Sequence, residues 1–174
     1  LERCNELCRR LCREVPPLPE AAEQVRKLGQ DHRAYPTRIL LLGYAAAAAF
    51  FTAFYGGTLL DTLCGGLCGL AVGLWMLWAS PRLRFNNLFQ TLIGAAIASL
   101  LALILVHMGI GGQLEAITIG TLMVLVPGMA LTNAMREIMA GDIISGLSRT
   151  ADAILVASAI ALGTVVGLAI GQMF

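Results

Sequence analysis

Polar and charged residues carried inside long apolar stretches are the part of this sequence that could do chemistry. Most of them lie in one segment, which starts at Pro127 and ends at Asp152. A charge in apolar surroundings is costly, so each one needs a partner, a water-filled cavity or a function. Helical spacing would place these residues on neighbouring turns, which predicts a binding site for a small polar ligand. The candidate residues in this segment are Pro127, Gly128, Thr132, Asn133, Arg136, Glu137, Asp142, Ser145, Gly146, Arg149 and Asp152.

The same segment has a simpler interpretation, in which its charges only pair with one another in a cytoplasmic amphipathic loop. Arg149 and Asp152, for example, are three residues apart and could meet on one helix face. Apolar residues such as Ile143 and Ile144 are interleaved with the charges, however. We therefore expect the segment to stay at the bilayer or to enter a cavity, and we favour a polar site.

The pair Pro127-Gly128 interrupts an apolar stretch and predicts a kinked or broken helix. Proline lacks the backbone N–H that a helix interior needs, and glycine loosens the helix further. Broken membrane helices expose backbone groups that bind ions or substrates in many transporters. A kink that serves packing alone is the other interpretation.

Asp61 is a second place where an acid lies in apolar sequence. It follows Gly56-Gly57, which we interpret as a tight turn between two spans, and it lies near the start of the second span. An acid in the first turn of a helix stabilises the free N–H groups there. Asp61 is therefore either such a capping residue or part of a path for an ion or a substrate.

No pattern in the sequence indicates an enzyme. The serine-hydrolase, zinc-protease and phosphate-loop motifs are missing, so we expect no catalytic residues. The five cysteines are spaced four apart within each group rather than as Cys-x2-Cys pairs, and they predict packing residues rather than a metal site: Cys4, Cys8, Cys12, Cys64 and Cys68. We therefore expect no metal and no cofactor, although coupling to a proton or other ion gradient is possible.

The composition requires that these residues be positioned by membrane helices. Of the 174 residues, 57% are hydrophobic and only 13% are charged, about half the charged share of a soluble domain. We predict an all-α integral membrane protein in which residues 1–37 form short amphipathic cytoplasmic helices, the end of a longer soluble region. Residues 38–174 form a membrane domain with about five spans, at about 38–55, 58–78, 88–107, 115–134 and 150–172.

The basic residues predict how the chain crosses the bilayer. Eight of the twelve precede residue 39, and the outer turns near 56–57 and 108–114 have none. The positive-inside rule then places the amino terminus in the cytoplasm and, with five spans, the carboxyl terminus outside. Glutamates are interleaved with the amino-terminal basic residues, which argues against nucleic-acid binding. The predicted surroundings are a lipid bilayer, and the odd number of spans indicates half of a homo- or hetero-oligomeric transporter.

The run Val126-Pro127-Gly128-Met129-Ala130-Leu131-Thr132-Asn133-Ala134-Met135-Arg136-Glu137, followed by Gly141-Asp142 and by Ser145-Gly146-Leu147-Ser148-Arg149, resembles the threonine/serine exporter family. Gly56-Gly57 with Asp61 is similar to that family's early motif, and Asn86-Asn87 before the third span also fits, which adds Asn87 to the candidate binding residues. The family often has an aspartate where this chain has Glu137. The resemblance covers about residues 38 to 174.

The resemblance implies export of small polar metabolites across a bacterial cytoplasmic (inner) membrane. It leaves open threonine and serine or a dicarboxylate such as succinate. It further implies the larger subunit of the two-component, succinate-exporter-like form, with a small membrane subunit of the same family as partner. A non-transporting assembly or scaffold subunit and a passive channel are the alternatives.

Overall fold

The computed structural model describes residues 2–14, 17–30, 36–79 and 86–173, and all regular structure within them is helical. Together with several long apolar helices, this confirms the predicted all-α membrane fold. The chain divides into two compact units, Leu1–Pro36 and Thr37–Phe174, each of which is described by itself.

The amino-terminal unit is a pair of short helices, α1 (Glu2–Glu14) and α2 (Leu18–Gln30), which pack on each other. Prolines separate them because a proline cannot continue a helix, although it suits a first turn. The carbonyl of Pro17 accepts hydrogen bonds from the N–H groups of Glu20 and Ala21 at the start of α2. Both helices are amphipathic, as the sequence predicted.

Four helices of the second unit are long and apolar enough to cross a bilayer, judged by length and composition over the described residues. Each begins and ends where an apolar run meets polar or glycine residues. They are α3 (Thr37–Phe54), α4 (Leu59–Leu74) with its π-helical continuation η1 (Trp75–Ala79), α6 (Asn87–His107) and α9 (Ile143–Gly171).

The fourth span expected at 115–134 is not one continuous helix. The structure divides it into α7 (Leu114–Leu122) and α8 (Gly128–Met139), with an irregular turn between them. Tight three-residue hydrogen bonds end α7, one of them from the N–H of Leu125 to the carbonyl of Leu122 at 2.9 Å. Pro127 then has no N–H with which to continue the helix, so the predicted interruption is a complete break.

The fifth span also differs from the expectation, because α9 begins at Ile143 rather than near residue 150. The carboxylate of Asp142 accepts a hydrogen bond from the N–H of Ser145 and so caps the helix there. Gly141, at a φ of 94°, makes the turn that precedes the cap. The polar stretch 134–149 is therefore the end of α8, a short turn and the first two turns of α9.

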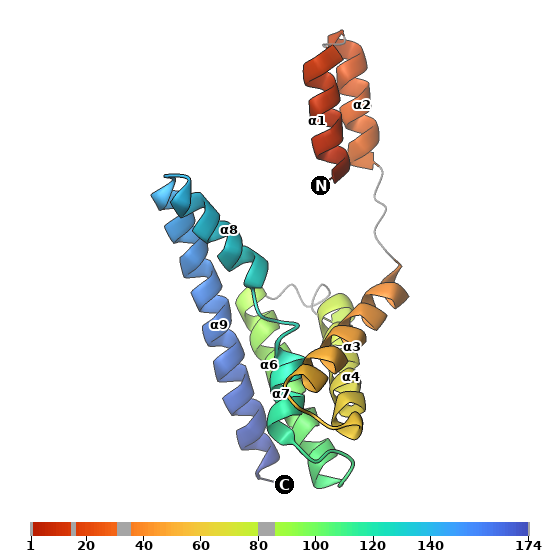
Figure 1. Cartoon of the computed structure of the whole chain (residues 1–174), viewed down its shortest axis with the longest axis vertical. Coiled ribbons are helices and arrows are strands. Elements are labelled where there is room, and N and C mark those ends of the chain that lie inside the picture. The colour runs from red at the N-terminus through yellow and green to blue at the C-terminus, as the bar shows by residue number, and fades with distance from the viewer. Residues whose placement is uncertain (1, 15–16, 31–35, 80–85, 174) are drawn as a thin grey trace. The chain divides into compact units, whose positions relative to one another are not determined.

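Small residues bring the long helices together. Gly163 and Gly167 of α9 lie against α6, where a Cβ on Gly167 would clash with the side chain of Ser99 and the backbone of Ala96. Such close contacts through small residues are typical of membrane helix pairs. Because higher-numbered residues of α9 meet higher-numbered residues of α6, these two helices run in the same direction (Figure 1).

The second group of packed helices is α3, α4 and α7. Gly69 of α4 allows the backbone of Tyr44 in α3 to approach closely, since a Cβ there would lie 2.7 Å from the Tyr44 carbonyl oxygen. Cys64, Cys68 and Ile117 are fully buried where α4, α6 and α7 meet. The break after α7 thus connects this group to the α8–α9 hairpin, which packs on α6 through α9 (Figure 1).

Candidate functional site

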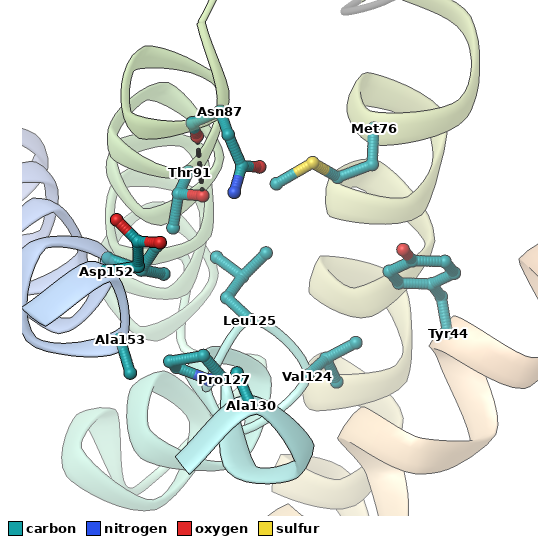
Figure 2. Close-up of a pocket in the computed structure, with 11 residues that line it drawn as sticks. Tyr44, Met76, Asn87, Thr91, Val124, Leu125, Pro127, Ala130, Asp152 and Ala153 are labelled. Atoms are coloured by element: carbon teal, nitrogen blue, oxygen red, sulfur yellow. Dashed lines mark hydrogen bonds between the residues drawn. The ribbon is translucent and has the colours of Figure 1, made fainter. Parts of the chain in front are cut away.

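A cavity of about 300 Å³ lies beside the break between α7 and α8 (Figure 2). Its size is at the lower end of the range for small-molecule sites, about 300–1,000 Å³. Five helical elements and the turn at the break contribute to its wall. The lining residues are Tyr44, Met76, Asn87, Thr91, Val124, Leu125, Pro127, Ala130, Asp152, Ala153 and Val156.

The start of α6 supplies two polar groups. Asn87 is the first residue of the helix, and Thr91 lies one turn later with only 4% of its surface exposed. The Thr91 hydroxyl donates to the Asn87 carbonyl at 2.9 Å, which fixes the rotamer of Thr91 at the cavity wall (Figure 2). The indole N–H of Trp75 donates to the carbonyl of Gln90 at 3.0 Å and so ties η1 to this part of α6.

The opposite wall comes from α3 and η1. Tyr44 packs against Gly73 of α4, where a Cβ would lie 2.9 Å from the Tyr44 Cβ, and its ring borders the cavity (Figure 2). Met76 belongs to the π-helical turn, a wider form of helix that is frequent at functional sites. A hydroxyl and a thioether therefore face the polar groups of α6 across the cavity.

Asp152 is the acidic residue of the site. It lies in the third turn of α9, next to Ala153, which is 5% exposed and packed against its neighbours. The Asp152 side chain itself is exposed on the cavity side. Within the part of the chain that the structure describes, its carboxylate has neither a hydrogen bond nor an ion pair. Among the described residues that line the cavity, it is also the single charged one.

Two of the other charged candidates, Glu137 and Arg149, pair with each other across the α8–α9 hairpin. Arg149 Nε lies 2.9 Å from Glu137 Oε1, and the Ser145 hydroxyl donates to Glu137 Oε2 at 2.8 Å. Gly146 allows this close packing, because a Cβ there would lie 2.9 Å from the carbonyl oxygen of Ala134. Glu137, Ser145 and Arg149 therefore bind one another, as in the simpler interpretation of this segment, in which its charges pair. The partner of Arg149 lies on the neighbouring helix.

Asp61 lies elsewhere and is not among the residues that line the cavity. Its side chain is fully buried, and both of its oxygens accept hydrogen bonds. Oδ2 accepts from the N–H and the hydroxyl of Thr58, in a reciprocal capping box, and Oδ1 accepts from the N–H groups of Gly112 and Gln113. This geometry favours the capping interpretation over an ion path.

The structure therefore separates the predicted residues into groups. Asn87, Pro127 and Asp152 line the cavity, whereas Thr132 is exposed and donates to the carbonyl of Gly128 in its own helix. Arg136 is also exposed. The remaining predicted residues lie in the hairpin or at its turn: Gly128, Asn133, Glu137, Asp142, Ser145, Gly146 and Arg149.

Sequence reasoning missed Tyr44, Met76 and Thr91. A signal existed for Thr91, since it lies one turn after Asn87 and places a hydroxyl on the same face of the helix. Tyr44 and Met76 carried no such signal, because their place at the cavity depends on how three separate helices pack.

Comparison with known proteins gives one consistent result. The model of a family described as "Putative threonine/serine exporter" matches residues 1–171. A protein of Mycobacterium tuberculosis named "Probable threonine/serine exporter" is 25% identical over 169 residues, 97% of this chain. An uncharacterized protein of Schizosaccharomyces pombe is 23% identical over 179 residues, 95% of this chain. The chain spans only 31% and 21% of those relatives, and no solved structure matches it significantly.

Proposed function

Because the chain belongs to the threonine/serine exporter family, we propose that it is part of a secondary transporter that exports small polar metabolites across the cytoplasmic membrane. The cavity at the break between α7 and α8 carries the proposal. A broken helix, a cavity of metabolite size and convergent polar side chains are what a transport site in a membrane bundle needs. Pro127 would cause the break because it has no N–H with which to continue a helix, and the first turn of α8 begins without a side-chain cap.

The length of α9 supports a cavity that opens toward the cytoplasm. Asp152 lies nineteen residues before Gly171, which is about 28 Å along a helix and close to the thickness of the hydrocarbon core. If the carboxyl end of α9 is at the outer boundary, Asp152 is at the inner one, where water reaches it. Asp61, in the first turn of α4, then lies on the outside. We propose that a small membrane subunit of the same family completes the transporter.

Blocking the cavity tests this function. Ala130 lines the cavity and has an exposed side chain, so Ala130→Phe should fill the space without disturbing the core. Ala151 is also exposed on α9 but does not line the cavity, and Ala151→Phe is the matched control. Efflux of threonine, serine and succinate is measured from cells that express the full-length protein with its partner, and from cells without it.

We expect the protein to increase efflux of at least one of these metabolites, Ala130→Phe to abolish the increase and Ala151→Phe to retain it. Efflux that continues after the ion gradient is collapsed would instead indicate a channel. If neither the protein nor its variants change efflux of any small metabolite, a scaffold role replaces the proposed function.

A further inference from the structure

Asp152 places a carboxylate at the wall of the cavity. None of the described residues that line this cavity carries a positive charge. The other polar groups at the wall are the hydroxyls of Tyr44 and Thr91 and the amide of Asn87, all of which are neutral. A ligand that carries a protonated amine would supply the missing charge. A ligand with two carboxylates would place like charges beside Asp152, which costs free energy.

Arg149 is the basic residue nearest to Asp152 along α9, but its ion pair is with Glu137 rather than with Asp152. Arg149 lies three residues earlier, a spacing at which side chains on a helix are neighbours. Its guanidinium is instead held by Glu137 of α8, 2.9 Å from Nε to Oε1. The second oxygen of Glu137 accepts from the Ser145 hydroxyl, which fixes the carboxylate in place. Glu137 therefore competes with Asp152 for the same arginine.

We propose that Asp152 recognises the protonated amino group of the substrate, and that Glu137 keeps this carboxylate available by holding Arg149 away from it. The inference rests on the proposed function and narrows it to substrates with an amine. Asp152 is the specificity-determining residue. Glu137 is a positioning residue, because it acts through Arg149 and does not line the cavity.

The first test measures specificity in inverted membrane vesicles that contain the full-length protein and its partner. Uptake of radiolabelled threonine is challenged with unlabelled threonine, with 2,3-dihydroxybutyrate, in which a hydroxyl replaces the amine, and with succinate. We expect threonine to compete at least tenfold better than either acid, since a charge-assisted hydrogen bond carries about that factor. Asp152→Asn should remove the preference, and Asp152→Glu should retain part of it.

The second test separates positioning from a structural role. Glu137→Gln frees Arg149 to pair with Asp152, so the apparent affinity for threonine should fall severalfold. The double variant Glu137→Gln/Arg149→Gln removes the competing cation and should restore the affinity, although it lacks the whole ion pair. Arg149→Gln alone should leave the affinity unchanged. Glu115→Gln, which changes an exposed acid in the first turn of α7, is the matched control.

The outcomes distinguish this inference from the function on which it rests. If the protein transports threonine but Asp152→Asn leaves the preference over 2,3-dihydroxybutyrate unchanged, the recognition role is wrong and the transporter stands. Succinate competing better than threonine would also overturn it. If the double variant is as weak as Glu137→Gln, Glu137 is only structural. Vesicles that take up none of these metabolites, while Ala130→Phe has no effect in cells, contradict the proposed function itself.

Discussion

The carboxylate of Asp61 accepts a hydrogen bond of 2.6 Å from the backbone N–H of Gly112, fifty-one residues later in the chain. The same oxygen accepts from Gln113, and the other oxygen accepts twice from Thr58. One buried side chain therefore caps α4 and fastens the connection between α6 and α7 to it. The Asp61 cluster, which we define as Asp61 with these three partners, holds the ends of three helices together.

We predict that Asp61→Ala destabilises the protein by about 1–3 kcal/mol, because it removes the cap of α4 and leaves the partly buried donors of Thr58, Gly112 and Gln113 without their acceptor. The midpoint of thermal unfolding in detergent measures this effect. Glu115→Ala, which changes an exposed first-turn acid, should shift the midpoint little. An Asp61→Ala protein that unfolds like the native one but no longer transports would instead support a role for Asp61 in an ion or substrate path.

The apolar runs predicted where three of the membrane helices start, to within one residue. Glycine and polar residues interrupt the apolar sequence at these places, and the thickness of the bilayer sets the length of each run. The runs expected at 38–55, 58–78 and 88–107 begin in the structure at Thr37, Leu59 and Asn87. The break at Pro127 was also predicted, since a missing N–H is a local property. Local chemistry and length thus predicted most of the fold.

The roles of the charged residues could not be predicted, since they depend on contacts between distant segments. Spacing along α9 offered Asp152 as a partner for Arg149, but the hairpin brings Glu137 of α8 to the guanidinium. Likewise, the backbone donors to Asp61 come from a connection that no local pattern links to α4. The sequence showed which residues needed partners, and packing decided which partners they have.

We predict opposite effects of alanine at two helical glycines. Gly167→Ala should destabilise the protein by about 1–3 kcal/mol, because its Cβ would overlap Ser99 and the backbone of Ala96 on α6. Gly43→Ala, in α3, meets no atom within 4 Å and should stabilise the protein by about 0.5–1 kcal/mol through its higher helix propensity. Thermal unfolding of the two variants in one detergent measures both. Equal shifts would contradict the close α6–α9 packing.

The turn between α8 and α9 depends on a glycine for a different reason. Gly141 has a φ of 94°, a conformation that L side chains rarely adopt, and a Cβ there would meet no atom within 4 Å. Gly141→Ala should therefore cost about 1–2 kcal/mol through the backbone alone. Gly128→Ala is the control, since it also has open space but no positive φ. Unfolding midpoints that do not separate the two variants would contradict this geometry.

The cysteines allow a test of membrane orientation. Cys8 and Cys12 are exposed in the amino-terminal unit, whereas Cys64 and Cys68 are buried in the membrane unit. In a Cys4→Ser background, a membrane-impermeant maleimide should label Cys8 and Cys12 in inverted vesicles, where the cytoplasmic face is outward. Sealed right-side-out vesicles should stay unlabelled, because the reagent cannot reach that face.

Mass spectrometry of the labelled peptides identifies the sites and provides an internal control. Cys64 and Cys68 should react only after denaturation in both preparations, since neither side chain is exposed in the folded unit. Labelling of Cys8 in right-side-out vesicles would place the amino terminus outside. The cavity beside Asp152 would then open away from the cytoplasm, opposite to the orientation that we propose.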